Sequence, residues 1–226
     1  MKLTYFGHSC FLVESAGKRL LFDPFITPNP LAAAIDISAV PADAILVSHG
    51  HLDHVADVVA IATRTGAAVV CNWEIGEWLG REGIQNVAAM NQGGRLSLGV
   101  CAVKMTSAIH SSTLPDGSPG GNPGGFVVEF PEGAFYYSGD SALTMDMKLI
   151  PEEFPLKFAV LPIGDRFTMG AADAARAAGF VGVETVVGVH YDTFPPITIN
   201  KRDALETFSQ AGRILLLPGI GESIEI

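Results

Sequence analysis

The chain has 226 residues, of which 48% are hydrophobic and 17% charged, a composition typical of a compact globular domain and not of a disordered segment. Its formal net charge of −10 disfavours nucleic acid as a partner, because binding to phosphate backbones depends on clustered Lys and Arg. No apolar run approaches the roughly 20 residues that span a bilayer. We therefore expect a single domain over residues 1–226, in the cytoplasm and without a membrane segment.

The first predicted strands share one feature, which is that each ends at a histidine or an aspartate. The runs at 3–7 and 20–22 are apolar and strand-like, and they lead into His8 and Asp23. The run at 44–47 is rich in branched residues and predicts a buried strand that leads into a cluster of histidines. In open α/β sheets, ligands bind at such carboxyl ends of strands.

Helical periodicity and stop signals such as Gly66 predict helices near 54–65, 73–82, 170–179 and 200–211. Together with the strands, they indicate two halves, residues 1–107 and 108–226. The one long loop, 111–125, is rich in Gly and Pro, and we expect it to be either a substrate lid or an ordinary surface connection.

The segment His49-Gly50-His51-Leu52-Asp53-His54 places four potential metal ligands in one strand-to-helix loop. His49 and His51 are two residues apart, so both imidazoles point to the same side of an extended segment. Asp53 and His54 can face a second position beside the first. These ligands suit zinc, and manganese, iron or nickel are alternatives. A polar loop that is His-rich by accident is less favoured, because the chain has only 6 histidines and three of them lie here.

Three further candidate ligands, His110, Asp140 and His190, also follow strand-like runs. For any one of them alone, an ordinary hydrogen-bonded residue would be the better interpretation. All 6 histidines of the chain nevertheless fall at predicted strand ends, which that interpretation does not explain. The three cysteines are widely spaced and form no Cys-x-x-Cys pair, so a disulfide framework and a thiolate zinc site are both unsupported.

The order of these residues resembles that of the metallo-β-lactamase superfamily, in which a His-x-His-x-Asp-His loop is followed by a lone His, a lone Asp after Gly, and a final His. Other segments resemble more closely a bacterial and archaeal group of metal-dependent hydrolases related to the ascorbate-6-phosphate lactonases. These segments are Tyr5-Phe6-Gly7-His8-Ser9-Cys10, Gly139-Asp140-Ser141, 162–170 and 190–195. The resemblance covers residues 1–226 and implies an α/β fold, a four-layer αββα sandwich with metals at one edge between the sheets.

The resemblance also implies a dinuclear centre of two divalent metal ions, with zinc as the first candidate. It assigns one ion to His49, His51 and His110, the other to Asp53, His54 and His190, and the bridge to Asp140. Two ions roughly 3.5–4 Å apart can share a water and lower its pKa from about 15.7 toward neutrality, and the resulting hydroxide attacks an acyl or phosphoryl centre. Asp53 is the candidate that orients this hydroxide and moves its proton.

Four charged or titratable residues lie outside that ligand set. His8 is a second catalytic candidate, for substrate binding or leaving-group protonation, with a supporting contact to a ligand as the alternative. Asp23 and Asp165 are expected to accept hydrogen bonds from ligand histidines. Arg166 is a candidate clamp for a carboxylate or phosphate, with a structural ion pair as the alternative.

The complete ligand set predicts a metal-dependent hydrolase of a small ester, lactone or phosphoester. The substrate can be anionic, because bound ions would offset the negative charge locally, and the sequence allows a homo-oligomer. A redox diiron or sulfur dioxygenase-type protein on the same fold is one alternative. Redox diiron proteins of this fold generally carry a carboxylate in place of a loop histidine, whereas His51 is kept here. A non-catalytic metal-binding protein is the other alternative, which the full set of ligands disfavours.

Overall fold

The computed structural model describes residues 1–226 and contains two mixed β-sheets that pack face to face. The first sheet has seven strands in the order β14-β1-β2-β3-β4-β5-β6. Their bounds are β1 Lys2–Gly7, β2 Cys10–Ser15, β3 Lys18–Phe22, β4 Ala44–Leu46, β5 Ala68–Asn72, β6 Val87–Met90 and β14 Ser223–Glu225. Strands β3 to β6 are parallel, and β2 is antiparallel to both β1 and β3, so β1, β3 and β4 all end at the same edge.

The second sheet also has seven strands, in the order β13-β12-β11-β10-β9-β8-β7. Their bounds are β7 Arg95–Ser97, β8 Ala102–Ser107, β9 Gly124–Phe130, β10 Gly133–Tyr137, β11 Leu156–Pro162, β12 Thr185–Val189 and β13 Ile214–Leu216. Strands β10 to β13 are parallel, and β9 is antiparallel to β8 and β10. Strands β8, β10 and β12 therefore end at one edge of this sheet.

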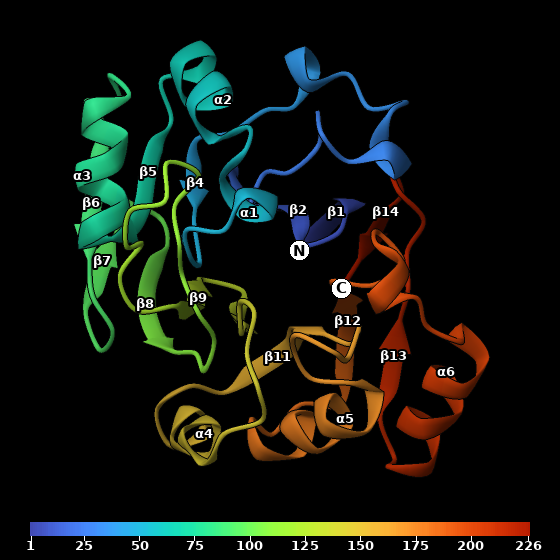
Figure 1. Cartoon of the computed structure of the whole chain (residues 1–226). Coiled ribbons are helices and arrows are strands. Elements are labelled where there is room, and N and C mark those ends of the chain that lie inside the picture. Colours follow the sequence, from blue (N-terminus) through green and yellow to red (C-terminus); the bar gives the residue numbers. More distant parts are fainter.

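Helices cover the outer face of each sheet, as Figure 1 shows, with the first three above and the last three below the sheets. They are α1 Leu52–Val55, α2 Val58–Thr65, α3 Trp73–Arg81, α4 Ile150–Glu153, α5 Ala171–Phe180 and α6 Lys201–Gln210. The four layers confirm the predicted αββα sandwich. None of these helices combines the length and the apolar character that crossing a membrane requires.

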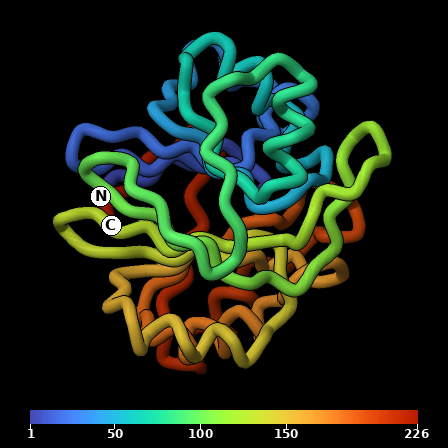
Figure 2. Tube along the Cα trace, turned by 90° about the vertical axis from the view of Figure 1, so that its left-hand side faces the viewer, coloured from blue at the N-terminus to red at the C-terminus, as the bar shows by residue number.

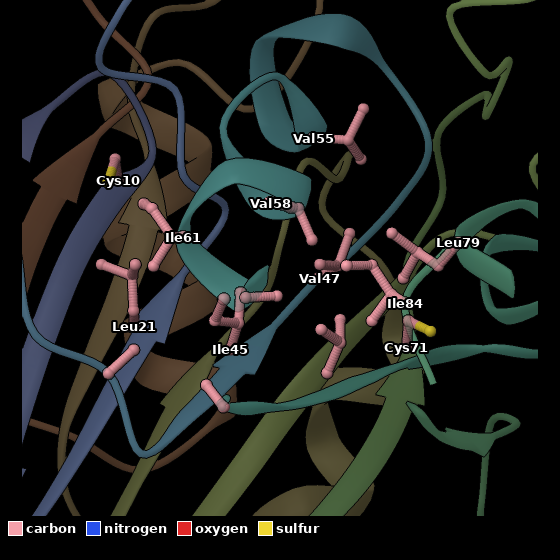
Figure 3. Close-up of a cluster of buried hydrophobic side chains, with 14 of the residues drawn as sticks. Cys10, Leu21, Ile45, Val47, Val55, Val58, Ile61, Cys71, Leu79 and Ile84 are labelled. Atoms are coloured by element: carbon pink, nitrogen blue, oxygen red, sulfur yellow. The ribbon is translucent and has the colours of Figure 1, made fainter. Parts of the chain in front are cut away.

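Three apolar cores fill the spaces between the four layers. The central core lies between the sheets and includes stacked Phe11 and Phe22, whose ring centroids are 4.4 Å apart. One outer core, drawn in Figure 3, packs Ile61 of α2 near Leu21 of β3 and Ile45 of β4. Each such fully buried side chain stabilises the fold by about 1.5–3 kcal/mol. The strand ends are thus held by well-packed sheets on both sides.

The boundary between the two halves differs from the sequence-based expectation of residue 107. Strands β7 and β8, which precede that residue, already belong to the second sheet, whereas the C-terminal strand β14 returns to the first and pairs with β1. Both termini therefore lie together at one side of the molecule, and the 111–125 loop projects at the opposite side in Figure 2. Hydrophobic patterning predicted these strands but carries no information on which sheet each joins.

Candidate metal centre

All candidate metal ligands lie at the edge where strands of both sheets end. The segment 49–54 follows β4, and His110, Asp140 and His190 come after β8, β10 and β12. The backbone is left-handed at His190, with a φ of 55°. Such a conformation costs a residue other than glycine about 1–3 kcal/mol and is concentrated at functional sites.

The three-histidine group consists of His49, His51 and His110, whose ligand atoms all lie within 4.8 Å of one another. Nε2 of His49 is 2.9 Å from Nδ1 of His51. Burial lowers the pKa of all three imidazoles, so that each ring is neutral near pH 7 and offers a lone pair. Neutral imidazoles of this kind are common ligands of zinc and of other first-row divalent ions.

The aspartate group consists of Asp53, His54 and His190, whose ligand atoms also lie within 4.8 Å of one another. Burial would raise the pKa of Asp53, but the hydrogen bond from His8 and the nearby His54 hold it well below its usual range. Burial would likewise lower the pKa of His54, but the neighbouring carboxylates raise it well above its usual value. Without a metal, His54 therefore carries a second proton near pH 7, and a bound divalent ion would displace this proton and leave an ionised carboxylate with neutral imidazoles as the donor set.

Asp140 lies between the two groups and is buried. Its Oδ2 is 2.9 Å from Nε2 of His190, 3.3 Å from Nε2 of His54, 3.6 Å from Nε2 of His110 and 4.0 Å from Nε2 of His49. Burial would raise the pKa of this carboxyl, but His190 and His54 hold it well below its usual range. One carboxylate thus faces imidazoles of both groups.

Unpaired buried atoms at this point fit a bound metal. Nε2 of His54 and Oδ1 of Asp140 are buried and make no hydrogen bond. Buried polar atoms are nearly always paired, so these atoms need a ligand that the polypeptide does not supply. Since Nδ1 of His54 already contacts Asp23 at 2.8 Å, Nε2 is the atom left to bind an ion.

Asp23 supports the aspartate group through its contact with Nδ1 of His54, as the sequence predicted. Its fully buried carboxylate accepts hydrogen bonds from the Ser48 backbone N–H at 2.7 Å and from the Ser48 hydroxyl at 2.5 Å. The Tyr137 hydroxyl donates a third bond at 2.5 Å. With these bonds in place, the carboxylate fixes the orientation of the His54 ring.

His8 also supports the aspartate group, from the end of β1. Its Nε2 is 2.9 Å from Oδ2 of Asp53, and its Nδ1 is 3.0 Å from Oγ1 of Thr193. Burial lowers the pKa of His8 to about 4, although the bond to Asp53 opposes this shift. Sequence analysis placed this imidazole in the cleft, in reach of the substrate. The structure instead buries the ring behind Asp53, and its role in turnover stays a prediction.

The 111–125 loop is anchored to the metal-ligand segment, which favours a structural connection over a lid. Leu114 is buried against Gly50, where an added Cβ would lie 3.1 Å from the leucine side chain. The Ser112 hydroxyl accepts a bond of 3.0 Å from the backbone N–H of Gly50, and Asn72 donates to two carbonyls of the loop. The loop therefore braces the turn between His49 and His51.

Asp165 and Arg166 lie away from the candidate centre. Both are exposed and line a separate cavity together with Asn200 and Asp203. The expectation that Asp165 accepts a hydrogen bond from a ligand histidine is therefore wrong. Sequence reasoning also missed Ser48 and Tyr137, because a serine and a core tyrosine beside candidate ligands carry no signal of their own.

The fold and this edge are those of metal-dependent hydrolases with the metallo-β-lactamase fold, and comparison with known proteins agrees. Residues 18–191 match the model of the β-lactamase superfamily domain. A UPF0173 metal-dependent hydrolase of Flavobacterium johnsoniae is 48% identical over 226 residues, which cover 100% of both chains. Another, from Methylacidiphilum infernorum, is 49% identical over 208 residues, or 92% of each chain.

Among solved structures, a metallo hydrolase from the archaeon Ignicoccus hospitalis superposes with a TM-score of 0.89 at 34% sequence identity, covering 99% of this chain and 97% of the other. The chain therefore belongs to the UPF0173 family of metal-dependent hydrolases, within the metallo-β-lactamase superfamily. The predicted hydrolase class is confirmed.

Proposed function

We propose that this chain hydrolyses a small ester, lactone or phosphoester at a centre of two divalent ions. The observation that carries the proposal is the position of Asp140, whose Oδ2 faces His190 of one group at 2.9 Å and His110 of the other at 3.6 Å. A carboxylate in this position could bridge two ions that lie roughly 3.5–4 Å apart, the separation of two-metal hydrolytic sites.

The two groups divide the candidate ligands between the ions. The first ion would be held by His49, His51 and His110 and the second by Asp53, His54 and His190, with Asp140 available to both. Zinc is the first candidate, and manganese, iron or nickel would accept the same donors. When bound, such ions supply Lewis acidity toward the substrate oxygen and lower the pKa of water.

Asp53 is proposed to orient the attacking water and to receive its proton. Its carboxylate lines the cleft and is held ionised, so it can accept the proton and later return it to the leaving group. We assign the positioning of this proton acceptor to His8, which contacts Asp53.

An ionised Asp53 only accepts hydrogen bonds, so Nε2–H of His8 must donate to it. Nδ1 of the neutral His8 ring then accepts from the Thr193 hydroxyl at 3.0 Å, in place of the longer bond of 3.3 Å that this hydroxyl can donate to the Tyr191 carbonyl. This chain of bonds fixes the tautomer and the orientation of His8, and through it one oxygen of Asp53. His8 is therefore proposed as a positioning residue, and the alternative of direct leaving-group protonation requires a ring that reaches the substrate.

Two alternatives from the sequence are disfavoured by particular residues. A redox diiron or sulfur dioxygenase-type centre is disfavoured by the neutral, histidine-only first group, because redox diiron proteins of this fold generally carry a carboxylate there. A non-catalytic metal-binding protein would not need the open cleft that Asp53 and Asp140 line.

The test is metal analysis of the purified protein followed by a turnover screen with zinc, manganese, iron(II) or nickel added to metal-free enzyme. We expect two equivalents per chain and hydrolysis of at least one neutral ester, lactone or phosphoester. Binding of a single equivalent at saturation would overturn the dinuclear centre. Two bound equivalents without hydrolysis of any of these classes would overturn the proposed reaction.

A further inference from the structure

The cleft over the candidate centre has a volume of about 250 Å³, and none of its lining residues other than candidate ligands carries a charge. Apart from candidate ligands, only Ser111, Phe167 and Phe194 line it. No Lys or Arg is among its lining residues. The part of the substrate that extends beyond the metal ligands therefore meets aromatic rings.

Phe194 is a fixed wall of this cleft. It lies in the loop that follows His190, and its ring contacts the His8 ring edge-on, with the ring centroids 5.4 Å apart. On another side it lies against Phe25, at 6.2 Å between centroids. Because both neighbours are buried, the ring is held in place and presents its remaining surface to the cleft.

Phe167 is the more exposed wall, with 54% of its surface accessible. It lies at the tip of a tight turn in which Asp165 and Arg166 are both left-handed, with φ of 60° and 52°. The base of the turn is tied to the site, because the Met169 N–H donates to the Ser141 carbonyl at 3.0 Å. Since Ser141 directly follows Asp140, this bond anchors the turn that carries Phe167 beside the candidate ligands.

Cations near this turn face elsewhere. Arg166, the neighbour of Phe167, lines the separate cavity formed with Asp203, and Lys201 pairs with Asp192 at 3.2 Å. A carboxylate or phosphate remote from the scissile bond would lose water here without gaining a cation, which is costly. Bound ions would attract negative charge only at the reacting centre, which they contact directly.

Large apolar side chains are also exposed on the loops that carry the candidate metal ligands. Leu52, between His51 and Asp53, and Ile109, next to His110, are each 56% exposed. Solvent-exposed apolar residues beside an aromatic-lined cleft are typical of a surface that receives an apolar ligand.

We propose that the substrate carries an uncharged apolar group, of the size of an aromatic ring, that packs against Phe167 and Phe194 while its scissile bond lies over the metals. The identity of the scissile bond rests on the proposed function, whereas the binding preference rests on the lining alone. The sequence allowed an anionic substrate, and the lining instead selects against a charge remote from the reacting centre.

A matched pair of esters tests this preference in zinc-loaded enzyme. Phenyl acetate and 4-acetoxybenzoate share the scissile ester and differ by one remote carboxylate. We expect kcat/KM to be roughly 10-fold higher for phenyl acetate, and Phe167→Ala to lower that value roughly 10-fold, mainly through KM. Leu149→Ala, an exposed apolar truncation outside this cleft, is the control and should leave the preference unchanged.

Calorimetric binding of the amide analogues acetanilide and 4-acetamidobenzoate separates this proposal from the reaction. If neither ester is hydrolysed but acetanilide binds more tightly and loses affinity in Phe167→Ala, the proposed reaction fails and the binding preference stands. Equal or tighter binding of 4-acetamidobenzoate, or no binding of acetanilide, would overturn the preference. An unchanged KM and affinity in Phe167→Ala would do the same.

Discussion

The three-histidine group and the aspartate group lie side by side at one edge, but they differ in charge and support. In the three-histidine group, serine hydroxyls are the outer contacts, with Ser48 3.0 Å from His49 and Ser111 3.3 Å from His51. In the aspartate group, the outer contacts are a buried carboxylate behind His54 and a buried imidazole behind Asp53.

This difference implies different strengths of metal binding. Outer contacts that orient a ligand typically contribute 10–100-fold in metal affinity, and a carboxylate orients an imidazole more strongly than a neutral hydroxyl does. We therefore expect the aspartate group to hold its ion more tightly. The ion of the three-histidine group keeps more of its charge, because it has no carboxylate of its own besides the shared Asp140, and we expect it to be the stronger Lewis acid.

The largest effect is expected for His49→Ala, which removes one imidazole from the three-histidine group. The variant should keep one equivalent of metal in the aspartate group and lose the other, and turnover should fall by about 10⁴-fold. Elemental analysis and kinetics on the same sample measure both. Retention of two full equivalents would remove His49 from the ligand set, and loss of both would show that the two groups do not bind independently.

Asp53→Asn should have the next largest effect, on the other group. The substitution keeps the shape of the side chain but removes its charge, so proton transfer is lost and kcat should fall roughly 10³-fold. Stability in urea should change far less. Asp165→Asn, at an exposed aspartate outside the centre, is the matched control and should be silent. Wild-type turnover by Asp53→Asn on a responsive substrate would remove its role as proton acceptor.

The strands and the candidate ligands were accessible from the sequence because both depend on local patterns, whereas the four-layer fold followed from the resemblance to the metallo-β-lactamase superfamily. Strand-like runs that end at His or Asp place ligands at one sheet edge, since parallel strands share their direction. The assignment of β7 and β8 to the second sheet was not accessible, because strand pairing is a long-range contact. Gly66 is a local signal that the structure confirms, because it adopts the left-handed conformation with a φ of 71° and caps α2.

The supporting residues of the site were predictable only in part. Asp23 followed the strand-end pattern and lies where that pattern places it, whereas Asp165, expected in the same supporting role, lies away from the candidate centre. The turn at 164–170 explains this difference, because Asp165 and Arg166, both in left-handed conformations, line a separate cavity, whereas Phe167 of the same turn lines the cleft. His8 showed the same limit, since the pattern brought it to the right edge but could not tell which side of Asp53 its ring would occupy.

His8→Ala tests the comparison between the two groups, because it removes a contact that supports the aspartate group but removes no proposed ligand. We expect nearly unchanged metal content and a loss of roughly 10²-fold, carried by kcat and not by KM, because Asp53 is no longer fixed. His8→Gln should recover part of the rate, since the amide N–H of glutamine can donate to Asp53 as Nε2–H does.

Two outcomes would contradict that assignment of His8. Loss of one metal equivalent in His8→Ala would make it a ligand of the aspartate group, whose atoms it approaches within 4.8 Å. A rate loss of the same size in His8→Ala and His8→Gln, with a new dependence on the leaving-group pKa, would favour direct protonation of the leaving group.

The smallest effect is expected for Tyr137→Phe, which removes one of the hydrogen bonds to Asp23 behind the aspartate group. Tyr136 offers a matched control on the same strand, because both rings are fully buried but the Tyr136 hydroxyl makes no hydrogen bond. A hydrogen bond to a charged group contributes about 1.5–3 kcal/mol, whereas removal of an unpaired buried hydroxyl is neutral or stabilising. Urea unfolding of the metal-free variants should therefore separate the two substitutions by about 2 kcal/mol.

Because Ser48 still holds Asp23 by two bonds, turnover of the zinc-loaded Tyr137→Phe enzyme should fall less than that of His8→Ala. Equal stability of the two variants would show that the Tyr137 bond contributes nothing to the support of the aspartate group, and Asp23 would then be held by Ser48 alone.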